Sequence, residues 1–446
     1  MFRCRARMFL LAGCLLASAA SLAIDLNSFE SQLERAREKV ARSDFAGARA
    51  DFEQLLREAP RHPRLQLGMA QSLVGLGLTR EAEGVYEDIV AEGFGAALSG
   101  DPTFLSIKDR LRDPSLVTRA GEQAAPIARG VQAFSIPERG FIAEGLAFDP
   151  NTGRFFVGST YLRKIVVHES DGRVVEFVPS GDHGLLQVLG MKVDEKRGRL
   201  VVLTGEDDAR LVNYEPGDRG RSAVFTYDLA TGRYLDAAWL RTPGVHLFND
   251  LVLTPDGAAY LTDSDEGRIY HWSADGNALE PVTPAGTFLY PNGIDLDASN
   301  HRLFVADFRG IFTVDLHDGK VARLPEAKSV SSVAIDGLYL HGNALIGVQS
   351  IDDLDRVMSF RLSPEQDRIE AAEPLERADP RVDRPTEGVV VGNRLYFIAR
   401  SFQDAVDDQG VIAALERAGP TTVLSVPLIP EPTNAQRRHI WQPLVR

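Results

Sequence analysis

The sequence contains little cysteine, with only Cys4 and Cys14 among 446 residues. Both fall in an N-terminal segment that combines three early arginines, an apolar run from Met8 to Ala17, and a Ser-Leu-Ala triplet that ends at Ala23. These features are typical of a secretory signal peptide with a small-x-small cleavage site. Removal of residues 1–23 would leave no cysteine, which excludes disulfides and a thiol nucleophile in the mature chain. We therefore expect an exported protein, either periplasmic or secreted.

Long apolar runs are also lacking. The apolar part of the N-terminal segment is shorter than the roughly 20 residues of a membrane-spanning helix, so we expect no transmembrane span. One alternative stays open at this end of the chain. Leu11-Ala12-Gly13-Cys14 resembles a bacterial lipobox, and the protein would then be a lipoprotein anchored through Cys14.

Positive charge is in deficit. Lysine and arginine number 49 against 63 aspartates and glutamates, which gives a net charge of −14 at pH 7. Such a chain has no general attraction for nucleic acid, so we expect no nucleic-acid partner. The 44% of hydrophobic and 25% of charged residues are ordinary for globular protein. At about 100–200 residues per domain, the length predicts two or three domains.

Residues 25–120 are predicted to form helices that contain an internal repeat. Ala48 recurs as Ala82, and Phe52 recurs as Tyr86, in both cases 34 positions later. This spacing resembles the second helix of a tetratricopeptide repeat. Two copies are fewer than an independent array needs, so the helices either pack on a neighbouring domain or bind a protein partner. Residues 121–130 are predicted to be a linker.

From residue 131 onward, short apolar strands separated by glycine-containing turns replace the helical pattern. Six of these strands share a start: one residue, here called X, is followed by an apolar-x-apolar strand, with glycine after X in five cases. Successive X positions lie 43 to 60 residues apart. Six such units predict a six-bladed β-propeller, and hence a mainly β fold with an N-terminal α-helical domain. The X residues are Glu144, Leu189, Asn249, Asn292, Asp336 and Glu387.

The propeller is predicted to span residues 131–428, with 429–446 as a C-terminal tail. Two segments have the sequence pattern of strands, residues 131–135 and 422–426. We expect them to share one blade and so to close the ring.

The X residues are expected to converge, because the innermost strand of every blade lines the central channel. Five of the six carry a carboxylate or amide oxygen. Oxygen ligands in a narrow channel are costly to leave unpaired, and a hard cation satisfies them. The set favours Ca²⁺, followed by Mg²⁺ or Mn²⁺. Zn²⁺ is less expected, because it more often recruits nitrogen or sulfur.

The motifs Glu144-Gly145, Asn249-Asp250, Asn292-Gly293 and Asp336-Gly337 carry a family resemblance. Across residues 131–428 the chain resembles the calcium-dependent propellers that include gluconolactonases, senescence marker protein, luciferin-regenerating enzyme and paraoxonases. The resemblance implies that Glu144, Asn249, Asn292 and Asp336 hold the metal. It also implies a metal-dependent hydrolase that acts on a small-molecule lactone or related ester, and the predicted signal peptide would make it an exported one.

A hydrolase of this kind needs a general base. By the resemblance Asp336 is the first candidate, followed by Glu387 and His183. His183 and His246 each lie shortly before an X residue, and a loop hydrogen bond is the simpler role for both. Asp263 and Asp307 follow second strands and are expected to stabilise turns.

One residue departs from the family pattern. Leu189 stands where hydrolytic members usually place a polar residue that contacts substrate, and we expect it to form an apolar wall. This departure supports a different class of function. The chain would then be a non-catalytic exported binding module with a structural metal, and its helical repeats would recruit a protein partner.

Overall fold

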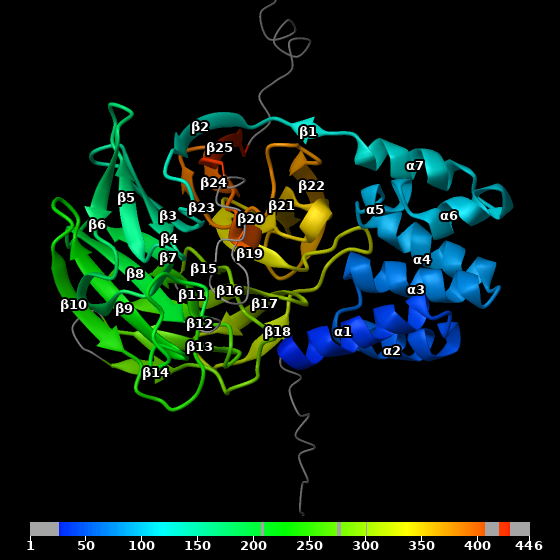
Figure 1. Ribbon diagram of the computed structural model, residues 1–446, viewed down its shortest axis with the longest axis horizontal. Helices are drawn as coiled ribbons and strands as arrows, with labels where there is room; N and C mark the ends of the chain where they lie inside the picture. Colours follow the sequence, from blue (N-terminus) through cyan, green and yellow to red (C-terminus); the bar gives the residue numbers. More distant parts are fainter. Residues whose placement is uncertain (1–25, 207–208, 274–277, 300, 406–418, 429–446) are drawn as a thin grey trace, which may run out of the picture.

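The computed structural model describes residues 26–206, 209–273, 278–299, 301–405 and 419–428. The predicted signal peptide, Cys14 and the predicted C-terminal tail lie outside these ranges. The described chain forms a β-propeller with a helical unit at its side (Figure 1). No helix within these ranges has the length and apolar character needed to span a membrane.

The helical unit comprises four helices of 13–16 residues followed by shorter ones. Local sequence sets some of their ends: the Asp44 side chain caps α2 by accepting from the Gly47 N–H, and Asp101 caps α6 by accepting from Phe104. The elements are α1 (Leu26–Ala41), α2 (Phe45–Glu58), α3 (Pro63–Gly75), α4 (Thr79–Ala91), α5 (Ala96–Ser99), α6 (Pro102–Ile107), the 3₁₀ turn η1 (Lys108–Arg110) and α7 (Ser115–Ala124).

The 34-residue repeat has a clear packing basis. Ala48 and Ala82 are fully buried, and so are the aromatic rings of Phe52 and Tyr86 four residues later. The small residues allow close helix approach, and a β-carbon placed on Gly68 would lie 2.2 Å from the Phe52 ring. The repeat therefore marks the positions where neighbouring helices touch.

Six four-stranded antiparallel blades make up the propeller, which confirms the predicted architecture. In chain order, from the inner strand outward, blade one is β3 (Ala143–Asp149), β4 (Arg154–Ser159), β5 (Lys164–His168) and β6 (Val174–Val178); blade two is β7 (Gln187–Asp194), β8 (Arg199–Glu206), β9 (Arg221–Asp228) and β10 (Tyr234–Trp239); and blade three is β11 (Phe248–Leu253), β12 (Ala259–Asp263), β13 (Arg268–Trp272) and β14 (Leu279–Pro281). Blade four is β15 (Ile294–Leu296), β16 (Arg302–Asp307), β17 (Gly310–Asp315) and β18 (Val321–Arg323); blade five is β19 (Ile335–His341), β20 (Ala344–Gln349), β21 (Arg356–Leu362) and β22 (Ile369–Arg377); and blade six is β23 (Gly388–Val391), β24 (Arg394–Arg400), β25 (Thr421–Pro427) and β2 (Val131–Ile136). The innermost strands contact one another in the order β3, β7, β11, β15, β19 and β23, and β23 contacts β3 again.

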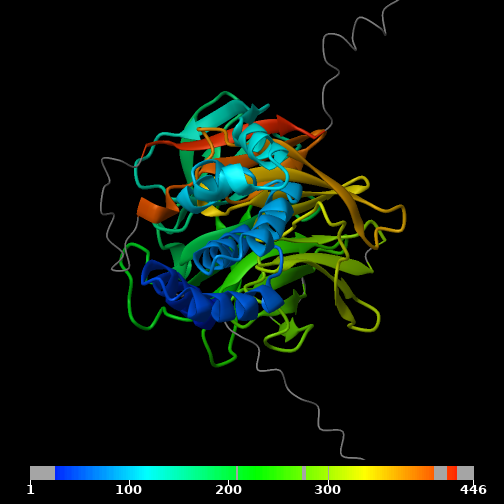
Figure 2. The ribbon, with the colours of Figure 1, turned by 90° about the vertical axis from the view of Figure 1, so that its right-hand side faces the viewer.

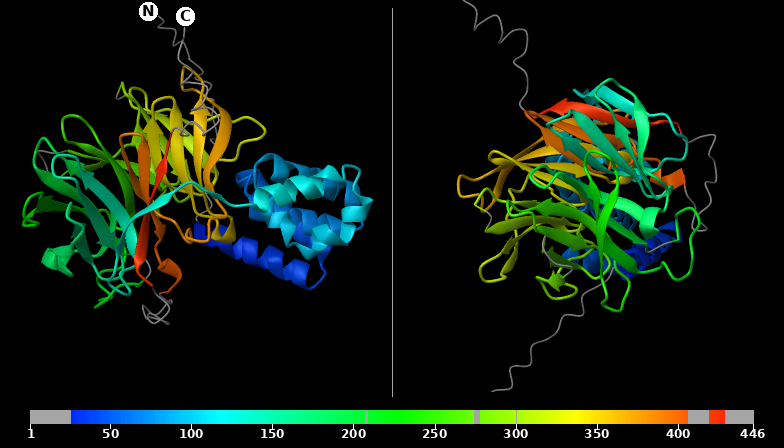
Figure 3. Two further views of the ribbon diagram at one scale, coloured as in Figure 1. Left: turned by 90° about the horizontal axis from the view of Figure 1, so that it is seen from above. Right: turned by 90° about the vertical axis from the view of Figure 1, so that its left-hand side faces the viewer.

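The ring closes as predicted, through a blade shared between the two ends of the propeller. Strand β2 crosses from the helical unit and pairs antiparallel with β25, with Val131 opposite Ser425 (Figures 1 and 3). The segment 121–130 differs from the expected linker. Its first residues belong to α7, and β1 (Ile127–Ala128) pairs with β22. Main-chain pairing with Glu376 and Arg377 therefore holds this segment against blade five.

The helices lie in front of the propeller in Figure 2, and they are docked on blades four and five through a buried arginine. The Arg356 guanidinium on β21 donates to Gln349 Oε1 at 2.6 Å and to the carbonyl oxygens of Glu92 and Gly93 at 3.2 and 3.1 Å. It also lies 3.6 Å from the centre of the Phe94 ring. One side chain of the propeller thus donates hydrogen bonds to the carbonyl groups that directly follow the C-terminal end of α4.

A second contact joins the helices to the loop after β16. The Phe308 ring packs edge-on against Phe29 of α1, with ring centres 4.9 Å apart, and stacks on His62 at 4.7 Å. Leu289, Val333 and Ile351 of the propeller belong to the same apolar core as the helices. The helical unit and the propeller therefore share a core.

Replacing Arg356 tests this docking. We expect Arg356→Met to lower the free energy of unfolding by at least about 2 kcal/mol, because several buried acceptors lose a charged donor. Arg361→Met is the matched control on the same strand, where an exposed pair with Glu370 predicts a change below about 1 kcal/mol. Urea denaturation measures both, and equal losses in the two variants would contradict the docking role.

The same interface predicts a pH dependence through Glu92. Burial raises the pKa of the Glu92 carboxyl from 4.5 to about 8, although Gln66 donates to it and Arg61 lies 3.8 Å away. A raised pKa stabilises the fold while the carboxyl is protonated, and this stabilisation is lost as the pH rises from about 4.5 through about 8.

We therefore expect the wild-type protein to lose more than about 1 kcal/mol of stability between pH 5 and 8.5 relative to Glu92→Gln. Denaturation curves at the two pH values provide the measurement. Glu87→Gln, on the exposed face of α4, is the control and keeps the wild-type pH dependence. Parallel pH profiles for wild type and Glu92→Gln would rule this coupling out.

Candidate metal and active site

Every blade carries a β-bulge at the start of its innermost strand, where two consecutive residues face one residue of the second strand. In blades one, two, three and five the ladder shifts across the X residue and its successor. Blade four shows the same feature, because Asn292 N–H donates to the Ala306 carbonyl and Ala306 N–H donates to the Gly293 carbonyl. A bulge redirects the side chains that it carries. The repeated X position is thus a repeated bulge.

Blade six carries its bulge one residue earlier. Thr386 N–H donates to the Ile398 carbonyl at 3.1 Å, and Ile398 N–H donates to the Glu387 carbonyl at 3.0 Å. Thr386 and Glu387 are therefore the pair that faces Ile398. Thr386 takes the X position, and Glu387 corresponds to the residue after X, such as Asp250 in blade three.

The glycines after X allow neighbouring inner strands to approach closely. A β-carbon on Gly145 would lie 2.1 Å from the Leu189 carbonyl oxygen. One on Gly190 would lie 2.6 Å from the Asn249 carbonyl oxygen. Each glycine thus accommodates the main chain of the next blade's X residue, and only a residue without a side chain leaves room for it.

One cavity of about 260 Å³ lies at the mouth of the channel, and it is called the inner cavity below. It brings together all four predicted metal ligands, Glu144, Asn249, Asn292 and Asp336, and the predicted apolar wall, Leu189. Several other lining residues were not predicted from the sequence. Gln403, Arg210, Gln187 and Thr160 come from loops and strand ends that show no repeated pattern.

The hydrogen bonds at the mouth leave acceptor atoms without donors. Asn249 Nδ2 donates to Ser264 Oγ at 3.0 Å, Asn292 Nδ2 donates to Asp336 Oδ1, and Gln403 Nε2 donates to Glu144 Oε2. The amide oxygens of Asn249 and Asn292 are buried and have no hydrogen-bond partner among the described residues. Buried acceptors of this kind are costly unless a cation or a donor meets them. The oxygen atoms at the mouth are therefore a suitable set of ligands for a hard cation.

Negative charge accumulates around this point. Glu144, Asp250, Asp336 and Glu387 interact electrostatically, and the ammonium of Lys192 lies 2.8 Å from Asp250 Oδ1. Burial, and then the neighbouring carboxylates, raise the pKa of Glu144 and of Glu387 well above the usual value. Burial raises the pKa of Asp336 to about 7. Carboxyl groups that lie this close to one another repel when ionised, which favours protons or cations beside them.

Glu387, predicted as a catalytic candidate, does not line the inner cavity. Its side chain is fully buried, and neither carboxylate oxygen has a hydrogen-bond partner among the described residues. The one-residue shift of its bulge explains this placement. The carboxylate adds to the negative electrostatic potential at the mouth but does not face the inner cavity.

His183 also lies outside the inner cavity. It belongs to the short 3₁₀ turn η2 (Asp182–Gly184), and its half-exposed ring stacks on Tyr234 of the outermost strand β10 at 4.0 Å. Its Nδ1 lies 2.9 Å from Asp182 Oδ2. The loop between the blades carries it away from the axis, so closeness in sequence to Leu189 was misleading, and we do not retain His183 as a base.

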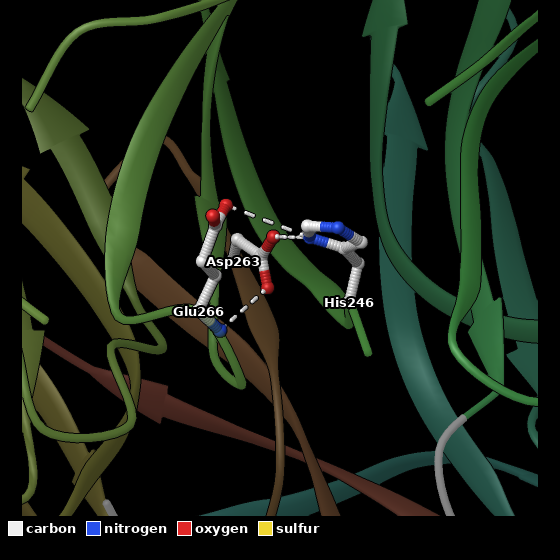
Figure 4. Close-up of side chains that lie close together, drawn as sticks. All are labelled: His246, Asp263 and Glu266. Carbon is white, nitrogen blue, oxygen red and sulfur yellow. Dashed lines mark hydrogen bonds and ion pairs between the residues drawn. The ribbon is translucent and has the colours of Figure 1, made fainter. Parts of the chain in front are cut away.

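His246 is buried and forms a cluster with Asp263 and Glu266 (Figure 4). Its Nδ1 lies 2.7 Å from Asp263 Oδ2 and 3.6 Å from Glu266 Oε2. Burial alone would lower the pKa of His246, but the hydrogen bond and charge of Asp263 outweigh it and raise that pKa. Three metal-ligand types therefore lie within 4.8 Å of one another.

The oxygens of this cluster already have partners, however. Asp263 Oδ1 accepts from the N–H groups of Leu247 and Glu266, and Glu266 Oε2 accepts from the Tyr270 hydroxyl at 2.6 Å. Asp307 has the corresponding position in blade four, where it accepts from the Leu289 N–H. Both aspartates thus stabilise turns, as expected, and the His246 cluster fixes the loop before Asn249.

Comparisons with known proteins find a family model that matches part of the chain and solved structures that are similar to it. Residues 39–99 match the tetratricopeptide repeat family model. A search of curated proteins finds no significant match. Among solved structures, a gluconolactonase from Xanthomonas campestris is similar with 15% identity, a TM-score of 0.47 and coverage of 69% of this chain and 93% of that chain. A luciferin-regenerating enzyme is 14% identical, with a TM-score of 0.45 and coverage of 67% and 95%. Regucalcin from Agrobacterium tumefaciens, a calcium-binding protein, is 18% identical, with a TM-score of 0.45 and coverage of 66% and 95%.

Substitution of Gly145 tests the close strand approach at the mouth. We expect Gly145→Ala to cost about 1–3 kcal/mol of stability, because its methyl group would overlap the Leu189 carbonyl. Gly217→Ala is the control, since nothing lies within 4 Å of a β-carbon there. Thermal unfolding of the two variants measures the effect, and a Gly145→Ala protein as stable as the control would disprove the steric account.

Proposed function

We propose that the chain is an exported, metal-dependent hydrolase of a lactone or related ester. The observation that carries this proposal is the surplus of buried, incompletely paired oxygens at the channel mouth. Buried acidic and amide groups without hydrogen-bond donors lower the stability of a fold. Their presence therefore favours a functional role for them.

Glu144, Asn249, Asn292 and Asp336 are the residues that would hold the metal. Their ligand atoms are all oxygens, and the unpartnered amide oxygens of Asn249 and Asn292 point to Ca²⁺ first, with Mg²⁺ or Mn²⁺ as alternatives. Zn²⁺ fits less well, since no nitrogen or sulfur ligand belongs to this set. When bound, such an ion supplies a Lewis acid that polarises the ester carbonyl and favours negative charge on its oxygen.

Asp336 is the residue to which we assign the general base. It lines the inner cavity, so its carboxylate can take a proton from a water molecule in that cavity. Asn292 donates to one of its oxygens and so fixes its orientation. In the proposed reaction the oxygen of water bonds to the carbonyl carbon and its proton passes to Asp336. The bond to the ester oxygen then breaks, and that oxygen receives the proton, which gives an acid and an alcohol.

The remaining lining residues bind and orient the substrate in this proposal. Leu189 and Leu247 offer apolar contact on one side of the inner cavity, and Gln187 and Gln403 offer polar contact. Leu189 thus limits the access of water to the reacting carbonyl and does not contact a polar group of the substrate.

Asp336→Asn tests the proposal, because it keeps the shape of the side chain but removes its charge and its basicity. We expect calcium affinity, measured by isothermal titration, to fall at least about tenfold. Hydrolysis of a panel of aryl esters and lactones should fall further, and EDTA should abolish it in the wild type. Asp383→Asn, an exposed carboxylate paired with Arg400, is the matched control and should leave both unchanged.

The outcomes separate the two classes of function. Calcium binding that depends on Asp336, with no hydrolysis of any ester or lactone, would favour the binding module with a structural metal. Calcium affinity that is the same in wild type and Asp336→Asn would overturn the metal site itself.

A further inference from the structure

A second, larger cavity of about 690 Å³ lies over the inner cavity, and it is called the outer chamber below. The two cavities share four lining residues, Arg210, Tyr290, Asn292 and Asp336. They therefore meet at two of the four predicted metal ligands, Asn292 and Asp336. A volume of several hundred Å³ is typical of sites for small organic molecules.

The helical unit builds one wall of the outer chamber. Glu30, Leu33, Glu34 and Arg37 of α1 recur at the spacing of one helix face, and all four line it. Asp336, on the opposite wall, comes from blade five. The chamber thus exists only where the helices meet the propeller.

This wall is held in a fixed position. Phe29 of α1 is fully buried against Phe308, and His62 stacks on the same ring. Burial, assisted by Arg64 and Arg37, lowers the pKa of His62 to about 3, so the stacked ring is neutral. Arg64, beside it, pairs with Asp353 of the propeller.

Apolar groups line the chamber together with charged side chains, most of which have partners. Its apolar lining includes Leu33 and Phe308 together with Ile335 and Ile351 of blade five. Arg37 pairs with Glu34 at 2.6 Å and Arg64 with Asp353 at 2.5 Å, and Arg210 and Arg384 also have interaction partners. A charged ligand would have to compete for these partners, whereas an uncharged apolar group can be buried without that cost.

We propose that the outer chamber binds an uncharged apolar arm of the substrate, so that the substrate is a lactone or ester with a sizeable alkyl or aryl substituent. The inference rests on the proposed hydrolytic function of the inner cavity, and it assigns α1 of the helical unit to substrate selection. Leu33 is then a specificity-determining residue, because it lines the chamber and is only half-buried, whereas Phe29, the other apolar lining residue of α1, is fully buried.

Leu33→Trp in the full chain tests this assignment, because a larger ring fills the space proposed for the arm. The measurement is the ratio of kcat/KM for p-nitrophenyl decanoate to that for p-nitrophenyl acetate. We expect this ratio to fall at least about tenfold in Leu33→Trp. Arg35→Trp is the matched control, since Arg35 is exposed on the same helix and does not line the chamber, and its ratio should stay within twofold of wild type.

A binding measurement separates failure of this inference from failure of the proposed hydrolysis. Calorimetric titration with 1-octanol in the presence of EDTA needs neither metal nor reaction. We expect octanol to bind wild type and Arg35→Trp, to bind Leu33→Ala more weakly, and to lose binding in Leu33→Trp. Circular dichroism establishes that each variant is folded, and Leu33→Ala provides the test if the tryptophan variant does not fold.

Octanol binding that is lost in Leu33→Trp, without hydrolysis of any ester, would support the chamber and refute the hydrolase. Ester hydrolysis with an unchanged decanoate to acetate ratio would keep the hydrolase and overturn the chamber assignment. No octanol binding to the wild type would likewise overturn it.

Discussion

The close approach of six inner strands around one axis is the constraint on which the channel mouth depends. The carbonyl of Leu189 occupies the space that a side chain at position 145 would need, and the carbonyl of Asn249 does the same at Gly190. This contact brings side chains from four blades into one small cavity. Their mutual repulsion and their lack of donors are consequences of that geometry, because a wider ring would admit water between them.

The helical unit has a second role in the same geometry. Arg356 and Phe308 anchor it to blades four and five, and α1 then extends over the channel mouth. From their sequence, the repeats were expected either to pack on a neighbouring domain or to bind a protein partner. The structure shows that they pack on the propeller, and that α1 also lines the outer chamber.

Much of the architecture could be predicted because it repeats. The spacing of X positions revealed six blades, and the pattern of alanines and aromatics revealed the helical repeat. Glu387 shows the limit of that approach. Its sequence, Glu-Gly followed by valines, matches the other blades, yet the hydrogen bonds of Ile398 shift its bulge by one residue and turn its carboxylate away from the cavity. Lining residues such as Gln403 and Arg210 could not be predicted, because loops position them and no period marks them.

Closure of the ring through β2 also constrains when the propeller can form. Strand β2 is the first strand of the propeller in the chain, yet its partner β25 is the last, so the N-terminal edge has no native neighbour until the whole propeller sequence is available. The helices before β2 form mostly local contacts and do not share this delay. During synthesis these helices can therefore contact one another before the ring closes. Strand β2, which follows them in the chain, pairs with β25 and closes the ring once the end of the propeller sequence is available.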